Sequence, residues 1–377
     1  MVSKLFKNLL PLIILFQVAC KKEIANNSYE PLVDIDDSSS AGKLATAIKK
    51  ANKKETVILK ADRPWEMGGL VYFSVYQEDS IIQLYYLCDD GNKQRHLCYA
   101  YSEDGINFIK PNLNLVAFDG SRDNNILNLS LDQASFFYDS SSEYPFKFLG
   151  MGNDYKLHYA YSKNGINFKL NNAPLVDYFS DSQNQIIYDP AERKYKYYLR
   201  NYQFDDKIKH PSQNSYYYRA VCYFESNILQ EIRFQGTPIL HPSSTSLFSL
   251  SSELPTIFNF DRSYSEGDIY KPSVVRYKDN IYLAYPSVFH HYTSAGDGFC
   301  SVSLYISSNG KDFKLVKSDL IKDEPHSYYL APGYASKKGV LYNYYWKVYT
   351  THANFKRVSE YVAIGYEMSP EELAVIE

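Results

Sequence analysis

Carboxylates stand beside amides or arginines in four short stretches of this 377-residue chain. The stretches are Asp62 to Glu66, Arg122 to Asn125, Asp181 to Asn184, and Asp268 to Tyr270. General acid/base catalysis by a pair of carboxyl groups needs one that is held protonated and a second that is ionised, and crowding acidic groups into one pocket separates their pKa values. The four stretches therefore predict an acidic pocket suited to this chemistry, if the fold brings them together.

A repeated turn motif indicates how the stretches are positioned. The segment YAYSEDGINF at 99–108 recurs as YAYSKNGINF at 159–168 and as LYISSNGKDF at 304–313, with degraded copies at 221–226 and 362–366. Each copy is typical of a strand that ends in Ser, a tight turn at Asp-Gly or Asn-Gly, and a second strand. The serines at 102, 162, 226 and 307 are 60, 64 and 81 residues apart, which accommodates one four-stranded sheet per repeat. Five such units arranged radially make a β-propeller.

Composition agrees with an all-β fold. Aromatic residues make up 16% of the chain, with 38 Tyr and 21 Phe, and both residue types favour strands. The sequence therefore predicts a five-bladed β-propeller of four-stranded antiparallel blades over residues 60–377. An amphipathic pattern with Leu44 and Ile48 predicts one short N-terminal helix at 41–53, and Ser369-Pro370 predicts the start of a last helix.

The N-terminus reads as an export signal. Lys4 and Lys7 precede an apolar run at 9–16 that is too short to span a bilayer, which is typical of a signal peptide over residues 1–19. Val18-Ala19-Cys20 resembles a bacterial lipoprotein cleavage site, in which Cys20 becomes the first mature residue and carries the lipid; ordinary secretion is the alternative. Residues 20–59 are then a tether and the short helix. We expect a membrane-anchored lipoprotein of a bacterial cell envelope, periplasmic or on the outer surface.

Charge and motif searches exclude several classes of function. Loss of Lys4 and Lys7 with the signal takes the formal net charge from −3 to −5, which argues against nucleic-acid binding. The sequence contains no Gly-rich phosphate loop, Gly-x-Ser-x-Gly elbow or His-Glu-x-x-His motif, so nucleotide, serine-hydrolase and zinc-protease functions have no support. No metal or cofactor is expected, although the sequence leaves open that a cation such as calcium binds in the channel.

Four cysteines remain after the signal, and their spacing matches no zinc pattern. They are Cys88, Cys98, Cys222 and Cys300. Cys88 and Cys98 flank a turn, so they either bridge two strands or stay as buried thiols.

The repeat turns and the acidic stretches resemble the five-bladed β-propeller glycosidases, the superfamily of the arabinanases, invertases and levansucrases. Arg63-Pro64-Trp65-Glu66, Ser121-Arg122-Asp123-Asn124-Asn125, Asp181-Ser182-Gln183-Asn184 and Asp268-Ile269-Tyr270 are similar to segments of exported bacterial proteins grouped with glycosyl hydrolases by that fold. The resemblance covers residues 60 to 370. It bears on the fold more than on the activity, because propellers host many functions.

The resemblance implies roles for the carboxylates. In that superfamily an acidic residue on blade one is the base or nucleophile, an Asp on blade two steadies the transition state, and a Glu on blade three is the acid. Glu66 or Asp62 would take the first role and Asp123 the second. Blade three offers Asp181 and no evident Glu, so Asp181 or Asp268 would replace the acid.

Residues near these carboxylates are candidate ligands of a sugar. They are Asp62, Arg63, Trp65, Arg122, Asn124, Asn125, Gln183, Asn184, Arg200, His291 and His352. Structural roles are the alternative for each: Asx turns for the amides, salt bridges for the arginines, and exposed or structural positions for the histidines. Asp104, Asn164 and Asn309 belong to the repeat turns and are not expected to function in the pocket.

The function expected from these features is hydrolysis of O-glycosyl bonds in an oligosaccharide or polysaccharide fragment by a monomeric enzyme. The missing blade-three Glu leaves open a non-catalytic glycan-binding lipoprotein. A glycoside phosphorylase is a third alternative; it needs a basic phosphate cluster, for which the sequence offers only Arg63, Arg122, Arg200 and Arg219.

Overall fold

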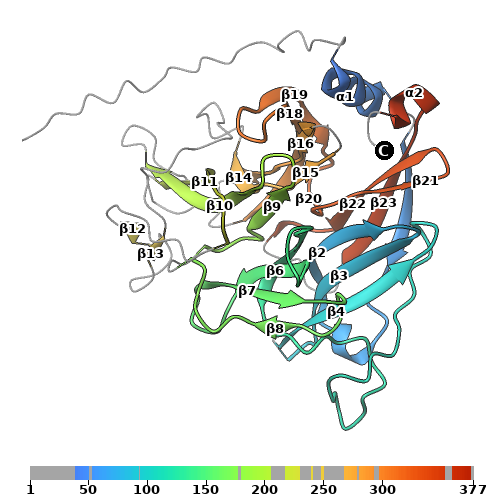
Figure 1. The fold of residues 1–377 in the computed structure, drawn as a ribbon, viewed down its shortest axis with the longest axis vertical. Coiled ribbons are helices and arrows are strands. Elements are labelled where there is room, and N and C mark those ends of the chain that lie inside the picture. The colour runs from blue at the N-terminus through green and yellow to red at the C-terminus, as the bar shows by residue number, and fades with distance from the viewer. Residues whose placement is uncertain are drawn as a thin grey trace, which may run out of the picture.

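Five small antiparallel sheets stand in a ring around a common axis, so the predicted five-bladed β-propeller is confirmed (Figure 1). The computed structural model describes residues 39–50, 53–92, 94–176, 180–204, 217–229, 239–240, 248–249, 267–277, 280–292, 297–352 and 359–374. Cys20 and the predicted signal segment lie outside these residues.

The first three blades follow the chain in order, each beginning with its innermost strand. Blade one is formed by β2 (Gly69–Glu78), β3 (Ile81–Asp89) and β4 (Arg95–Ser102). Blade two is formed by β5 (Asp132–Tyr138), β6 (Phe146–Met151), β7 (Leu157–Ser162) and β8 (Lys169–Leu170). Blade three is formed by β9 (Gln185–Asp189), β10 (Lys194–Phe204) and β11 (Tyr217–Ser226), and a separate hairpin by β12 (Ile239–Leu240) and β13 (Phe248–Ser249).

Blades four and five have interrupted inner strands. In blade four, β14 (Asp268–Lys271) and β15 (Val274–Arg276) share the innermost position, β16 (Tyr282–Ala284) and β17 (Ser287–His291) share the second, and β18 (Gly298–Ser307) and β19 (Lys314–Ile321) follow. In blade five, β20 (Ser327–Leu330) and β21 (Ala335–Lys337) precede β22 (Val340–Val348) and β23 (Ser359–Glu367). Blades two and four therefore have four strand positions, and blade five reaches four with the N-terminal strand described next. Blades one and three have three strand positions among the described residues.

The ring is closed by the N-terminal strand. β1 (Lys53–Leu59) pairs antiparallel with β23 as the outermost strand of blade five, with Lys53 opposite Tyr366. β1 precedes residue 60, where the sequence predicts that the propeller begins. Its first residues are polar and largely exposed, so the sequence carries only a weak strand signal there.

Two short helices flank this closure. The predicted N-terminal helix is α1 (Ser40–Lys50), which buries Leu44 and Ile48 against β18 and β19 and lies beside α2 (Figure 1). The last helix, α2 (Pro370–Leu373), begins at Pro370 because the Ser369 hydroxyl caps the backbone amide of Glu372. No helix in the described ranges is long and apolar enough to cross a membrane.

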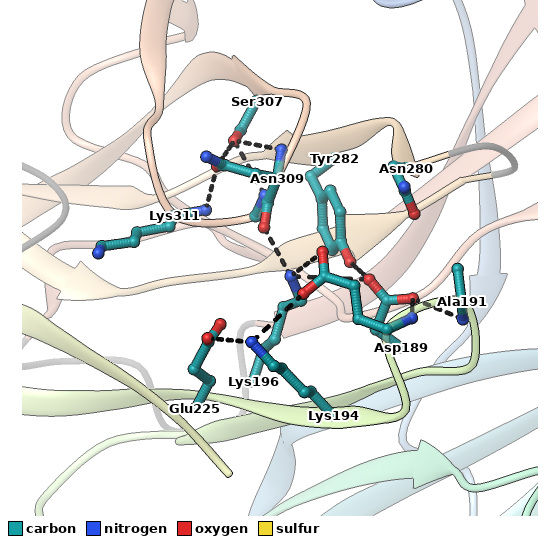
Figure 2. A network of polar contacts seen from close by, with 12 residues as sticks. Asp189, Ala191, Lys194, Lys196, Glu225, Asn280, Tyr282, Ser307, Asn309 and Lys311 are labelled. Atoms are coloured by element: carbon teal, nitrogen blue, oxygen red, sulfur yellow. Dashed lines mark hydrogen bonds and ion pairs between the residues drawn. The ribbon is translucent and has the colours of Figure 1, made fainter. Parts of the chain in front are cut away.

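The repeated turns join neighbouring blades. The carbonyl of Gly310, in the turn after β18, accepts a hydrogen bond of 2.7 Å from the Tyr198 hydroxyl of blade three. In the same turn, the Asn309 carbonyl accepts from Lys196 Nζ at 2.7 Å (Figure 2). The Gly105 carbonyl accepts in the same way from Tyr344 of blade five, at 3.1 Å. The repeat turns at Gly105 and Gly310 are therefore joints between blades, and they provide acceptors for the buried hydroxyl groups of Tyr344 and Tyr198.

Inner-strand hydrogen bonds complete the ring. They run from Phe136 N to Ser74 Oγ (3.0 Å), from Ser135 Oγ to the Asn184 carbonyl, from Val274 N to Gln185 Oε1 (2.8 Å), from Ser273 Oγ to the Leu330 carbonyl (2.6 Å), and from Val75 N to the Pro332 carbonyl (2.9 Å). Each bond joins one blade to the next, so the innermost strands run side by side and their starting ends gather at one mouth of the axis.

Candidate functional site

The starting ends of the innermost strands bring together a group of polar and aromatic side chains, which we name the Asp181 mouth. Its members from these strands, and from the segment just before β9, are Tyr72, Gln133, Asp181, Asp268, Tyr270 and Tyr329. Arg200 of β10, Arg219 of β11, His291 of β17 and His352, which follows β22, complete it. All five blades contribute.

Asp181 is the partly exposed carboxylate of this mouth. Its Oδ1 accepts a hydrogen bond of 2.8 Å from Gln133 Nε2. Burial, followed by the negative charge of Asp181, raises the pKa of Tyr270 to about 12. The Tyr270 hydroxyl lies 3.1 Å from that of Tyr72, and both stay protonated at neutral pH. Asp181 therefore faces hydroxyl donors from two other blades.

Asp268 is a buried carboxylate held between two basic groups. Its Oδ2 lies 3.3 Å from Arg219 Nη1, and its Oδ1 lies 3.2 Å from His291 Nε2. Burial alone would raise the pKa of Asp268, but the Arg219 charge and the His291 hydrogen bond hold that pKa below its usual value. Asp268 is therefore ionised at neutral pH and orients Arg219 and His291.

Tyr270 is the aromatic centre of the site. The guanidinium carbon of Arg200 lies 5.0 Å from its ring centroid and that of Arg219 lies 5.9 Å away. Arg200 also donates to the Tyr270 carbonyl, so its buried guanidinium is committed to the protein. The His352 ring lies 4.7 Å from the Tyr270 ring; burial and the Arg219 charge lower the pKa of His352 to about 4, which leaves it neutral at neutral pH.

The arrangement suits a polyhydroxylated ligand. It offers one partly exposed carboxylate acceptor, tyrosine and histidine hydrogen-bonding groups, one partly exposed cation in Arg219, and aromatic ring faces. Among the described residues, no group of three or more His, Cys, Asp or Glu side chains is arranged to hold a metal ion. Hydrogen bonding to hydroxyl groups and stabilisation of charge are chemistry that these side chains can supply.

Five of the predicted residues meet at this mouth: Asp181, Asp268, Arg200, His291 and His352. Glu66 has other partners. It is fully buried, pairs with Lys110 Nζ at 2.7 Å and accepts from the Tyr86 hydroxyl at 2.6 Å. Asp62 pairs with the same Lys110, at 2.6 Å, and with Arg63, at 3.6 Å, on the exposed side.

The stretch at 122–125 lies in the loop that follows β4, and not at the start of a blade. Arg122 and Asp123 are exposed, and Asp123 accepts from Asn112. Asn124 Oδ1 accepts from the backbone N–H of Ile126 at 3.1 Å, which is the Asx turn of the structural alternative, and its amide donates to the Val116 carbonyl at 2.8 Å. Asn125 accepts from the Trp65 indole at 3.0 Å and donates to the Tyr86 hydroxyl at 2.7 Å, so Trp65 and Asn125 belong to the surroundings of Glu66.

Gln183 and Asn184 are buried and committed to backbone and side-chain partners. The Gln183 amide donates to the carbonyls of Phe73 and Ala134, while its oxygen accepts from Lys271. Asn184 donates to the carbonyls of Ser180 and Ser182 and accepts from the Arg200 backbone. These amides hold the inner strands in place.

The four arginines considered for phosphate binding do not form one cluster. Arg200 and Arg219 share the Tyr270 ring, whereas Arg63 pairs with Asp62 and Arg122 is exposed on the 122–125 loop. The basic site that a phosphorylase would need is therefore not assembled from these residues.

Tyr72 and Gln133 were not identified from the sequence as site residues, and Arg219 was not identified as the partner of Asp268. Tyr270 and Tyr329 lie in stretches expected at blade starts, but the sequence assigned neither of them a role. The signal for Gln133 was present, since Asp132-Gln133 directly precedes the apolar run 134–138. The Asx-rich stretch at 122–125 was interpreted as the start of blade two, but that blade begins ten residues later, with β5 at Asp132. The tyrosines carried no distinguishing signal, because the same residue type packs between the blades.

Comparisons with known proteins agree with the architecture. No protein-family model matches the chain, and no curated protein matches it in sequence. Among solved structures, one called a glycoside hydrolase has a TM-score of 0.56 at 9% identity, covering 87% of this chain and 97% of its own. A glycosyl hydrolase from Bacteroides ovatus has a TM-score of 0.51 at 13% identity, covering 80% and 85%. A structure described as a BT0996 RGII complex has a TM-score of 0.55 at 9% identity, covering 86% and 95%. This chain is thus similar in fold to five-bladed β-propeller glycoside hydrolases.

Proposed function

We propose that this protein is an exported glycoside hydrolase that acts on an oligosaccharide bound at the Asp181 mouth. The observation that carries the proposal is that a partly exposed carboxylate, Asp181, and a buried ionised one, Asp268, both lie at this mouth of a fold similar to that of glycoside hydrolases. Asp181 would be the base or nucleophile, and the Tyr270 hydroxyl, which is protonated at neutral pH, would give its proton to the leaving oxygen. Asp268 would orient Arg219 toward the charge that develops during the reaction.

A carbohydrate ligand has support from two further sources. The partly exposed Tyr270 ring, whose centroid lies 5.9 Å from the Arg219 guanidinium carbon, offers apolar surface to the C–H groups of a sugar. One of the structural neighbours is described as an RGII complex. Neither source favours a particular sugar or linkage.

The direct test is hydrolysis of arabino-, galacto-, xylo- and fructo-oligosaccharides by the purified protein, with Asp181→Asn and Asp268→Asn as site variants. Asp123→Asn is the matched control, because Asp123 is exposed and lies on another loop. We expect turnover by the wild type and the control, and at least 100-fold less by both site variants. Equal turnover by Asp181→Asn would contradict the role of this mouth.

A second candidate function is glycan binding without cleavage. It is favoured by the state of Asp268: Arg219 and His291 keep this carboxylate ionised, so it is poorly suited to be a general acid. His352, neutral because of its pKa of about 4, would not supply the proton at neutral pH either. Calorimetry that detects oligosaccharide affinity, together with no turnover across the same panel, would select this alternative.

Export and lipid attachment at Cys20 belong to the same proposal and rest on the sequence Val18-Ala19-Cys20 after the apolar run. Metabolic labelling with a radioactive fatty acid in a bacterial host is the test. We expect label on the wild type and none on Cys20→Ser, with both proteins exported. A labelled Cys20→Ser variant would refute attachment at this residue.

A further inference from the structure

A cavity opens at the end of the propeller axis opposite the Asp181 mouth. Its volume is about 650 Å³, within the range of about 300–1,000 Å³ that is usual for ligand pockets. The ends of the innermost strands line it: 75–77 of β2, 136–138 of β5, 185–188 of β9, 274–276 of β15, and 332–334 between β20 and β21. We name it the Tyr138 mouth.

Buried polar side chains fill the axis near the Asp181 mouth. Lys271 of blade four donates to Gln183 Oε1, and the Gln183 amide donates to Phe73 of blade one at 3.0 Å and to Ala134 of blade two at 2.9 Å. Lys271 and Gln183 are only 2% and 1% exposed. These hydrogen bonds connect four blades across the axis. They therefore separate the Tyr138 mouth from the Asp181 mouth.

Three partly exposed tyrosines form the walls of this cavity. The Tyr76 and Tyr138 rings stack 4.8 Å apart with an interplanar angle of 16°. Tyr334 packs against the Tyr277 ring at 4.3 Å. Each ring is thus held in place by another tyrosine, so a ligand that binds against it pays little conformational entropy.

Polar groups interrupt these aromatic walls. Gln77 is oriented by Ser336, whose backbone N–H donates to Gln77 Oε1 at 2.8 Å. Arg276 is held by Asp189 at 3.3 Å, and Ser140 stands exposed at the edge of the cavity. Rigid phenol rings alternating with amide, hydroxyl and guanidinium groups match a ligand that has both C–H faces and hydroxyl groups.

We propose that the Tyr138 mouth is a second, non-catalytic binding site for a glycan chain. The site would hold a chain while the Asp181 mouth acts on another part of it or on a neighbouring chain. The choice of a glycan as the ligand rests on the proposed function, whereas the cavity and its walls do not. Its test must therefore separate binding at this mouth from events at the other one.

Affinity electrophoresis of the full chain in gels that contain soluble arabinan, arabinoxylan or galactan provides that separation. Tyr334→Ala removes one wall, and Ser140→Trp obstructs the cavity without removing a wall. We expect Tyr334→Ala to bind the retarding polysaccharide about 2- to 12-fold more weakly than the wild type, because one ring contact is worth about 0.5–1.5 kcal/mol. We expect Ser140→Trp to weaken binding at least as much, because its indole occupies the space of the ligand. Tyr155→Ala is the matched control, since Tyr155 is 53% exposed and does not line the cavity.

The remaining outcomes decide against the proposal. A wild type that no polysaccharide retards would overturn it, and so would unchanged retardation of both Tyr334→Ala and Ser140→Trp. Loss of retardation in Asp181→Asn alone would place all binding at the Asp181 mouth. Urea unfolding of each variant identifies any that fails to fold, and hydrolysis of a short oligosaccharide, which we expect to be unchanged in Ser140→Trp, reports on the proposed function separately.

Discussion

His291 Nε2 lies 3.2 Å from Oδ1 of Asp268, while Arg219 Nη1 lies 3.3 Å from Oδ2 of the same carboxylate. The three residues come from β17, β14 and β11, so this contact joins blades three and four at the Asp181 mouth. An ionised, buried carboxylate with both oxygens engaged can orient its neighbours, but it has little freedom to exchange a proton during a reaction.

Replacement of Asp268 by Asn should reduce stability as well as function. The variant leaves the Arg219 guanidinium without its counter-charge, and breaking a buried pair costs about 3 kcal/mol. We expect the urea midpoint to fall accordingly, while Asp123→Asn, on an exposed loop, changes the free energy of unfolding by less than about 0.5 kcal/mol. Equal midpoints for Asp268→Asn and wild type would show that the pair contributes no net stability.

His352 should make stability depend on pH. Its pKa is about 4 in the folded protein, below the usual value of 6.5, so the unfolded chain takes up this proton first as the pH falls. Stability is therefore lost between about pH 6.5 and pH 4, by at most about 3 kcal/mol and by less where water reaches the ring. The measurement is urea unfolding of wild type and His352→Gln at pH 7 and at pH 4.5.

The difference between the two proteins isolates this histidine, because all other titrating groups are shared. We expect wild type to lose more stability than His352→Gln on acidification. Parallel losses in the two proteins would mean that His352 is protonated as easily in the folded chain as in the unfolded one.

Replacing a turn glycine by alanine tests whether the repeat turn is packed against the neighbouring blade. Gly310 has φ of +72°, and a Cβ there would stand 2.9 Å from the Tyr198 hydroxyl and 2.9 Å from the Tyr282 ring. Gly339 has φ of +80° and open space around it. Alanine should cost about 1–2 kcal/mol at Gly339, from backbone strain alone, and about 1–3 kcal/mol more at Gly310, from crowding. Thermal unfolding of the two variants measures the difference, and equal losses would contradict a packed joint.

The part of the fold that the sequence could predict is the part that these turns specify. The Ser-x-Asp-Gly or Ser-x-Asn-Gly pattern is local chemistry, so it predicted the strand before each turn and, with the spacing of the copies, the number of blades. The strand expected after the turn is present as β8 and β19, whereas blade one has only an isolated bridge there, between Tyr101 and Ile109. β1 escaped prediction because a polar edge strand forms only when β23 offers it a partner more than 300 residues away. Local signals cannot encode such a pairing.

The candidate site was predictable only in part, for a related reason. Asp181 and Asp268 stand just before or at the start of an innermost strand, so locating the strand located the carboxylate. The partners that decide their chemistry, Gln133 and Arg219, come from neighbouring blades. Glu66 has an equally suggestive local sequence, but Lys110 and Tyr86 enclose it.

Glu66 and Asp181 should therefore respond in opposite ways to loss of charge. Glu66 is fully buried between Lys110 and Tyr86, so Glu66→Gln should lower the free energy of unfolding by about 3 kcal/mol while leaving the activity of the folded fraction unchanged. Asp181 is partly exposed and hydrogen-bonded to Gln133, so Asp181→Asn should change stability by less than about 1 kcal/mol and remove turnover. Urea unfolding and hydrolysis assays on the same preparations make the comparison, with the exposed Glu103→Gln as the control for both. If Glu66→Gln keeps full stability and loses turnover, the carboxylate that matters for catalysis is on blade one, and the Asp181 mouth is not the reaction centre.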